Sequence, residues 1–214
     1  YASHQMFTMS KFWERVFFFL TFLVQGSSFL NPRAYAILHR LHHKHSDTEK
    51  DPHSPEFSKN IIMLNVNTVK HYESVRRNKK DYSKYDYNVP RWESLEKFSD
   101  YLITRAAFIV LYTLIYVTYS TSPWQYMLLP IHFVMGPLHG SIVNWCGHRY
   151  GYVNHKKTND KSKNTIPFDF LMMGELFQNN HHWKPKSINF SSRWFEIDPG
   201  FLITKILNKI NMIR

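Results

Sequence analysis

The segment from Ala106 to His148 contains no Lys, Arg, Asp or Glu, although these four residue types make up 20% of the chain. A bilayer core of about 30 Å needs about 20 apolar residues per helix. These 43 residues therefore have room for two membrane-spanning helices and a turn. Ser120–Pro123 is the one polar, helix-breaking cluster in the segment. We predict a membrane hairpin with spans at Leu102–Tyr119 and Trp124–Trp145. The alternative, a buried hairpin of a soluble protein, fits the mean hydropathy of −0.40.

Basic residues flank this hairpin on both sides. Nine Lys or Arg lie between Lys70 and Arg105, five lie between Arg149 and Lys163, and the turn has none. By the positive-inside rule, both flanks are cytoplasmic. A shorter apolar run, Val16–Leu30, has 15 residues and contains Gln, Gly and Ser, which favours an interfacial or re-entrant segment over a span. These patterns predict an all-α integral membrane protein with a cytoplasmic helical cap.

Composition narrows the classes of function. Hydrophobic residues reach 43% and aromatic residues 17%, which excludes a disordered chain. The single cysteine, Cys146, excludes an internal disulfide framework and a thiolate-bound zinc or iron–sulfur site. The formal charge of +11 favours an anionic partner such as a lipid head group or a phosphorylated substrate. Because the charge lies beside the predicted spans and no nucleic-acid-binding fold is recognised, we expect no nucleic-acid partner.

Thirteen histidines form clusters with helical spacing. The segment His39–His43 reads His-Arg-Leu-His-His, and offsets of three and four residues place its imidazoles on one helical face. The segment Gln178–His182 repeats this pattern with an amide at the first position. Asn144 and His148 are four residues apart at the cytoplasmic end of the second predicted span. The predicted hairpin therefore brings all three sites to the same side of the membrane.

So many convergent imidazoles predict a metal centre. Imidazole binds Fe, Zn, Cu and Ni, so the ligand type leaves the metal open. A tetrahedral zinc site with three protein ligands and a water needs fewer histidines than converge here, which favours two metal ions. The chain has no H-E-x-x-H, E-x-x-H, G-x-S-x-G, P-loop or G-x-G-x-x-G motif. These absences argue against zincins, soluble carboxylate-bridged di-iron bundles, α/β-hydrolases and nucleotide-binding loops.

The segment His39–His43, followed by Ser46–His53 (Ser-Asp-Thr-Glu-Lys-Asp-Pro-His), resembles the membrane fatty acid desaturases of the acyl-CoA delta-9, stearoyl-CoA desaturase-like type. Asn144–His148 is similar to the N-x-x-x-H element of that family, and Gly174–His182 is similar to its third histidine box. The first box of the family is H-R-x-x-x-H, and Tyr1–His4 fits its last four positions. The resemblance covers almost the whole chain. It implies that the sequence is N-terminally incomplete and lacks one ligand and the first membrane hairpin.

The resemblance also implies a di-iron cofactor, two Fe2+/Fe3+ ions held mainly by imidazoles. The ligands that it implies are His4, His39, His42, His43, His148, His181 and His182. It further implies that Asn144 contributes through a water. Gln178 stands where the third box normally opens with His, and whether its amide oxygen binds iron is left open. Residues near the boxes are candidates to hydrogen-bond the metal-bound imidazoles. They are Asp47, Glu49, Asp51, His53 and Glu175. The alternative for the carboxylates is that they only balance neighbouring Lys and Arg.

The activity implied by the resemblance is an O2-dependent desaturation, of the delta-9 type, that introduces a cis double bond into a saturated fatty acyl-CoA or acyl-lipid. The chain has no haem, flavin or iron–sulfur motif, so we expect an external electron donor, either cytochrome b5 or a ferredoxin-like protein. The active site is expected at the cytoplasmic face of the bilayer. Two alternatives remain. One is a histidine-box membrane hydroxylase or other oxygenase. The other is a non-enzymatic membrane protein that stores or senses metal, or an inactive relative, for which Gln178 is the only hint.

Overall fold

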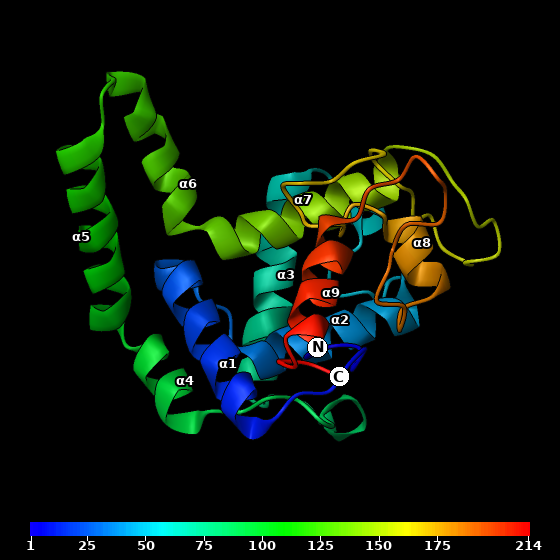
Figure 1. Ribbon diagram of the computed structural model, residues 1–214, viewed down its shortest axis with the longest axis horizontal. Coiled ribbons are helices and arrows are strands. Elements are labelled where there is room, and N and C mark those ends of the chain that lie inside the picture. Colours follow the sequence, from blue (N-terminus) through cyan, green and yellow to red (C-terminus); the bar gives the residue numbers. More distant parts are fainter.

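The computed structural model describes residues 1–214 as an assembly of helices, which confirms the predicted all-α class (Figure 1). No β-strand is present, and extended pairing is limited to isolated bridges. The α-helices are α1 (Lys11–Gln25), α2 (Pro32–His45), α3 (Ile61–Arg76), α4 (Glu93–Asp100), α5 (Leu102–Tyr119), α6 (Leu129–Phe133), α7 (Met135–Arg149), α8 (Gln178–Trp183) and α9 (Pro199–Lys209). The 3₁₀ helices are η1 (Gly26–Ser28), η2 (Pro55–Phe57), η3 (Ser83–Tyr85) and η4 (Pro123–Leu128).

Helix α2 begins where the sequence supplies a cap. The Asn31 side chain accepts a hydrogen bond from the Ala34 N–H at 3.0 Å, and Pro32 lies in the first turn, where no N–H is needed. Asn31 also donates to Glu96 at 2.7 Å, which ties the start of α2 to α4. The buried apolar face of α2 packs against Val75 of α3. These contacts fix the rotation of α2 about its axis, and with it the direction of the histidines.

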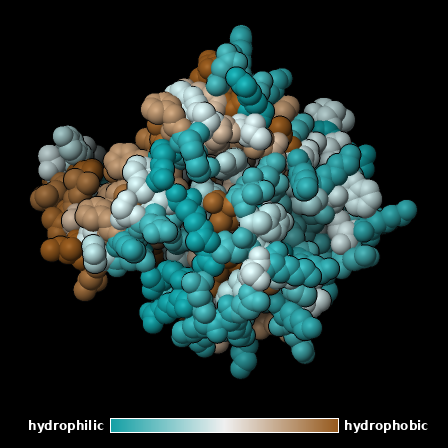
Figure 2. All heavy atoms as spheres, turned by 90° about the horizontal axis from the view of Figure 1, so that it is seen from below, coloured by the Kyte–Doolittle hydropathy of each residue, from teal (hydrophilic) through white to brown (hydrophobic).

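Helix α5 has the length and composition of a membrane span. Its 18 residues have a mean hydropathy of 1.6, and 6% of them are buried within the structure. It is the one continuous helix that meets both criteria. In Figure 1, α5 and the segment that follows it project away from the other helices. Figure 2 shows apolar atoms gathered at that end, whereas the rest of the face is mainly hydrophilic. The bounds Leu102–Tyr119 coincide with the first predicted span.

The second predicted span, Trp124–Trp145, is not one continuous helix. The chain breaks at Val134, and the segments Pro123–Phe133 and Met135–Arg149 meet at 82°. Together the two segments are long and apolar enough to cross a membrane only as a bent span or a re-entrant loop. The straight second arm of the predicted hairpin is therefore corrected to a bent pair of helices.

The break has a local cause and a distant support. Pro137 has no N–H to donate to the Phe133 carbonyl, so the usual helical hydrogen bond at this point is lost. That carbonyl instead accepts a hydrogen bond from Ser27 Oγ at 3.1 Å. The Gly136 N–H donates to Ser28 Oγ at 3.0 Å. The serines of η1 thus satisfy the backbone groups that the break leaves without helical partners.

The segment Val16–Leu30 forms most of α1 together with η1 and the two residues after it. Phe18 and Phe22 are buried and pack with Leu95 of α4 in a small apolar core. The other face of α1 leaves several large apolar side chains exposed: Phe12, Phe19, Leu20, Leu23 and Val24. An interfacial helix requires such an exposed apolar face, and the position of α1 at a membrane remains a prediction.

Candidate metal centre

Four imidazoles, of His4, His39, His43 and His181, form a first group. His39 and His43 lie one turn apart on α2, His4 belongs to the segment before α1, and His181 lies on α8. The Nε2 atom of His39 is 2.7 Å from that of His4, 3.0 Å from that of His43 and 3.4 Å from that of His181. The Nε2 atoms of His43 and His181 are 3.0 Å apart. The four Nε2 atoms therefore face one common point.

Three imidazoles, of His42, His148 and His182, form a second group whose ligand atoms lie within 4.8 Å of one another. The Nε2 atoms of His42 and His182 are 3.3 Å apart. His148, at the end of α7, is 2% exposed, and its Nε2 atom is buried without a hydrogen-bond partner. Helices α2, α7 and α8 each contribute one histidine to this group.

Each His-His pair in the sequence divides between the two groups. His42 belongs to the second group and His43 to the first, and His182 and His181 divide in the same way. Adjacent residues on a helix point in directions about 100° apart, which produces this division. The ring centroids of His43 and His182 are 4.5 Å apart, so the two groups adjoin. The arrangement supplies two neighbouring metal positions rather than one.

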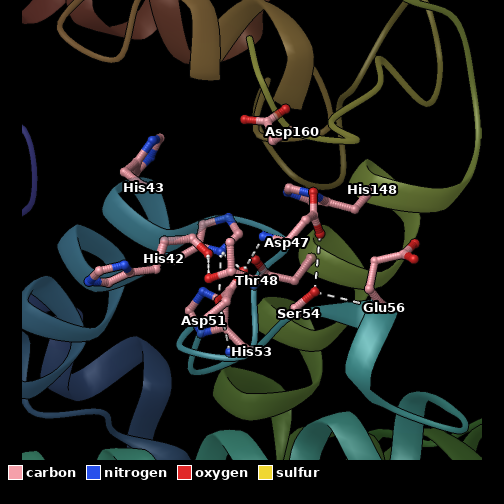
Figure 3. A network of polar contacts seen from close by, with 12 residues as sticks. His42, His43, Asp47, Thr48, Asp51, His53, Ser54, Glu56, His148 and Asp160 are labelled. Carbon is pink, nitrogen blue, oxygen red and sulfur yellow. Dashed lines mark hydrogen bonds and ion pairs between the residues drawn. The ribbon is translucent and has the colours of Figure 1, made fainter.

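Three carboxylates hold the imidazoles of the second group, and Figure 3 shows two of them, Asp51 beside His42 and Asp47 beside His148. Asp51 accepts a hydrogen bond from His42 Nδ1 at 2.9 Å, and Asp47 accepts one from His148 Nδ1 at 2.8 Å. The third carboxylate lies in the loop before α8, where Asp160 accepts from His182 Nδ1 at 2.7 Å. Because Nδ1 carries the proton in each case, Nε2 is left as the atom with a free lone pair.

The donor set fits metal ions. In the second group, Nε2 lone pairs face one another in a buried site, and no N–H is present to satisfy them. Burial also keeps the imidazoles neutral, because it lowers the pKa of His42 and His181 well below the ordinary value and that of His43 to about 2. Neutral imidazole nitrogens are the form that binds Fe, Zn, Cu or Ni. Both groups could therefore hold a metal ion.

The remaining predicted carboxylates differ in their positions. Asp47 and Asp51 contact metal-site histidines, as described above. Glu49, from the same loop, is exposed, and no hydrogen bond links it to a histidine. Glu175 is partly buried and contacts the site through its backbone, since its carbonyl accepts a hydrogen bond from Gln178 Nε2 at 2.8 Å. Burial raises the pKa of Glu175 to about 7.

The remaining uncharged candidates lie near the histidines without hydrogen-bonding to them. His53 is buried with its ring 4.6 Å from that of His42, and neither of its nitrogens has a partner. The Asn144 amide donates to the Gly140 carbonyl at 2.8 Å. Gln178 is 2% exposed, and its Oε1 atom is buried without a partner. A buried amide oxygen that is free in this way can accept a hydrogen bond or bind a metal.

Two residues that support the site were not among the predicted set. Asp160 holds His182, as described above. The Arg40 guanidinium donates to the carbonyls of Ala2 and Ser3 at 3.0 and 2.8 Å, and it also donates to Tyr85 and Tyr87. It thereby fixes the segment that carries His4. Arg40 lies inside the His39–His43 motif, so the motif could have identified it as a site residue. No sequence pattern distinguishes Asp160 from the other loop carboxylates.

An apolar cavity of about 630 Å³ reaches the first histidine group. Its wall comes mainly from the segment before α1 and from α1, α2 and α7, and includes Phe7, Phe17 and Phe18. His39, Asn144 and Gln178 line the same cavity. Its volume lies within the range of about 300–1,000 Å³ that is typical of ligand sites. The cavity can therefore place an apolar ligand next to the metal centre.

Comparison with known proteins agrees with this geometry. A family model for fatty acid desaturases matches residues 1–196. An sn-1 stearoyl-lipid 9-desaturase from Synechocystis sp. is 27% identical over 99% of this chain and 63% of that protein. Another from Anabaena variabilis is 24% identical over 99% of this chain and 73% of that protein. An acyl-CoA 5-desaturase from Anemone leveillei is 27% identical over 98% of this chain and 62% of that protein.

The chain thus spans roughly two thirds of the length of these relatives. The family model, however, matches far more than half of the chain. The chain belongs to the fatty acid desaturase family.

Proposed function

We propose that this protein is an integral membrane, O2-dependent desaturase that introduces a cis double bond into a saturated fatty acyl chain. Two iron ions would occupy the two histidine groups, at the cytoplasmic face of the bilayer. Residues 1–214 would form the desaturase domain, with α5 and the bent pair after it as a membrane hairpin. The observation that carries the proposal is the pair of adjoining histidine groups beside an apolar cavity that reaches His39.

The reaction defines what the chain must do. One saturated –CH2–CH2– unit, one O2, two electrons and two protons give one –CH=CH– unit and two H2O. When bound, the two irons would supply the activation of O2 that removal of hydrogen from an unactivated methylene requires. The apolar wall of the cavity would hold the acyl chain and exclude water from it. Asp47, Asp51 and Asp160 would keep three imidazoles in the tautomer with a free Nε2 lone pair.

The names of the relatives bear on the position of the double bond and on the acyl carrier. The relatives from Synechocystis sp. and Anabaena variabilis are named sn-1 stearoyl-lipid 9-desaturases, which supports delta-9 chemistry on a lipid-linked chain. The relative from Anemone leveillei is named an acyl-CoA 5-desaturase at similar identity. We therefore propose delta-9 as the position and keep both acyl-CoA and acyl-lipid as substrates for the experiment to separate.

Mass analysis of the lipids from cells that express the protein tests the reaction. Desaturation lowers the mass of an acyl chain by two units, and the double-bond position identifies the methylene pair that reacted. A gain of sixteen units would instead show hydroxylation. Feeding an isotopically labelled acyl-CoA or acyl-lipid to membranes separates the two carriers.

A substitution in the metal centre tests the role of the histidines. His42→Ala removes a ligand of the second group, and we expect product to fall below detection with iron content reduced. His71→Ala is the matched control, because His71 is exposed on α3 and contacts neither group. Both variants should insert into membranes at the wild-type level. Unchanged turnover of His42→Ala would contradict the catalytic role of the cluster.

A further inference from the structure

A second cavity, of about 440 Å³, approaches the metal centre separately from the apolar one. No residue lines both cavities. His148 and Asp160 form part of its wall, so it borders the second histidine group. Neighbouring residues at the start of α8 divide between the two cavities, since Gln178 lines the apolar one and Asn179 lines the second. The metal centre therefore has two approaches with different surroundings.

The second cavity is polar and cationic. Four cationic side chains line it: Arg149, Lys156, Lys161 and Lys163. Two carboxylates oppose them, Glu56, which pairs with Lys161, and Asp160, which accepts a hydrogen bond from His182, so four positive charges face two negative ones. Lys156 is exposed, forms no ion pair, and is followed by a second exposed lysine, Lys157. The rim of this cavity thus presents uncompensated positive charge to solvent.

Hydrogen bonds connect the wall of this cavity to the imidazoles. The Lys161 N–H donates to Asp47 Oδ2 at 2.8 Å, and the same oxygen accepts from His148 Nδ1 at 2.8 Å. The preceding residue, Asp160, accepts from His182 Nδ1 at 2.7 Å. Two imidazoles of the second group are therefore each one carboxylate away from the Asp160–Lys161 backbone. Electron tunnelling weakens steeply with distance and with gaps in bonding, and these hydrogen bonds give a continuous connection from the Asp160–Lys161 segment to both imidazoles.

The proposed function, on which this inference rests, needs an external electron supply. Four electrons reduce O2 to two H2O; the acyl chain gives two of them as its two C–H bonds break, and two must come from outside. The two protons that complete the water come from solvent. The metal centre is enclosed by protein, so a carrier must dock at a surface next to it.

We infer that the cationic rim around Lys156 and Lys157 is the docking surface for an acidic, one-electron carrier protein, which delivers electrons to the second histidine group past Asp160 and Lys161. The two required electrons arrive in two successive encounters, and each encounter oxidises one carrier molecule. Charge complementarity accelerates such transient encounters by about 10- to 1,000-fold at low ionic strength. The acyl substrate and the electron carrier then reach the metal centre through separate cavities and do not exclude each other.

A phosphate-bearing acyl carrier is the competing occupant of this cationic rim. The acyl chain needs an apolar cavity, and the one that reaches His39 shares no lining residue with the cationic cavity. A nucleotide head group bound at Lys156 would therefore not lie along the wall that holds the acyl chain. The geometry favours the electron-carrier protein over the acyl carrier, and the experiment separates the two.

The test reverses the two free charges in the double variant Lys156→Glu/Lys157→Glu. The matched control is Lys79→Glu/Lys80→Glu, an exposed lysine pair in the segment after α3 that lines neither cavity. The purified protein is assayed with an acidic ferredoxin and with the acidic soluble domain of cytochrome b5 at increasing ionic strength. In parallel, the protein is reduced without a carrier by anaerobic dithionite, freed of excess reductant, and given O2 and substrate for a single turnover.

We expect the second-order rate constant for carrier oxidation to fall at least tenfold in Lys156→Glu/Lys157→Glu and to lose its dependence on ionic strength. Iron content, the dithionite-driven single turnover and the KM for the acyl substrate should stay within twofold of the wild type, and the control pair should match the wild type throughout. Unchanged carrier kinetics would overturn the inference. A raised KM for acyl-CoA with unchanged carrier kinetics would assign the rim to the substrate head group instead. If the wild type makes no unsaturated product after dithionite reduction, the proposed function fails, whereas carrier binding, measured by titration, still tests the surface.

Discussion

The substitution Asp160→Asn removes a single charge beside His182 and nearly preserves the shape of the side chain. In the wild type, one carboxylate oxygen accepts from His182 Nδ1 at 2.7 Å, and the other accepts from the Ser162 N–H at 2.9 Å and from Ser162 Oγ. The side chain is 7% exposed and that of His182 is 2% exposed, so water cannot readily replace either contact.

An asparagine cannot satisfy both partners. If its carbonyl oxygen keeps the Ser162 N–H, its amide group faces His182 Nδ1 with two donors. His182 would then have to carry its proton on Nε2, which removes the lone pair that it offers to the second group. The opposite orientation places the amide against the Ser162 N–H, another donor. Either choice weakens the metal site.

Two estimates of the cost agree. A hydrogen bond to a charged group contributes about 1.5–3 kcal/mol. Loss of a carboxylate that orients a metal-bound histidine lowers metal affinity or activity by about 10- to 100-fold, which is roughly 1.4–2.7 kcal/mol. We therefore expect Asp160→Asn to lower the iron affinity of the second group by about 10- to 100-fold, and that of the first group by less than twofold.

Iron titration with measurement of bound metal per chain checks this expectation. At a free iron concentration that just fills both groups of the wild type, Asp160→Asn should retain about one iron per chain. Glu49→Gln is the control, since Glu49 carries the same charge but is exposed and contacts no histidine. The circular dichroism spectrum should not change in either variant. Equal iron affinity in Asp160→Asn and wild type would refute the argument that the carboxylate sets the tautomer of His182.

Two further predictions concern packing and protonation. A Cβ atom added to Gly147 would lie 2.2 Å from Gln178 Cγ, so Gly147→Ala should lower the free energy of unfolding by about 1–3 kcal/mol. Gly140→Ala, on the same helix with no atom within 4 Å of an added Cβ, is the control, and equal denaturation midpoints would contradict the packing argument. Burial lowers the pKa of His4 to about 4, whereas a histidine in the unfolded chain titrates near 6.5. Below pH 6.5 the unfolded state therefore binds more protons than the folded state, and the metal-free protein should lose stability as the pH falls from about 6.5 to 4. Melting temperatures that stay constant over this range would contradict the prediction.

The sequence predicts the features of the fold that depend on local pattern. The run without charge, Gly or Pro from Ala106 and the helix-breaking cluster Ser120–Pro123 predict a helix that ends at Tyr119, and the structure confirms the predicted bounds Leu102–Tyr119. Pro137 indicates a weak point in the second predicted span, but the local pattern does not predict the break at Val134. Its geometry depends on Ser27 and Ser28, which are more than 100 residues away in the chain, and only the tertiary fold brings their hydroxyls to the exposed backbone groups.

The same distinction applies to the metal centre. Helical periodicity places His39, His42 and His43 together without knowledge of the tertiary fold. It does not show which loop carboxylates turn inward. Asp47 has a φ of +57°, which redirects the loop after α2 so that its carboxylate reaches His148, while Glu49 two residues later points to solvent. Side chains in loops have no fixed period, so the sequence treats the carboxylates of this loop alike.

The two histidine groups differ in a way that assigns them different tasks. Each imidazole of the second group donates its Nδ1 proton to a carboxylate, whereas no carboxylate contacts the first group, and the Nδ1 atom of its member His181 is buried without a partner. A carboxylate on Nδ1 raises the basicity of the imidazole and fixes its direction. The second group therefore offers a more electron-rich and more rigid set of ligands. It also borders the cationic cavity, while the first group borders the apolar one through His39. In the proposed function, the electron-rich position would face the electron supply and the less constrained position would face the acyl chain. The entry of electrons would then be separate from the place where hydrogen is removed.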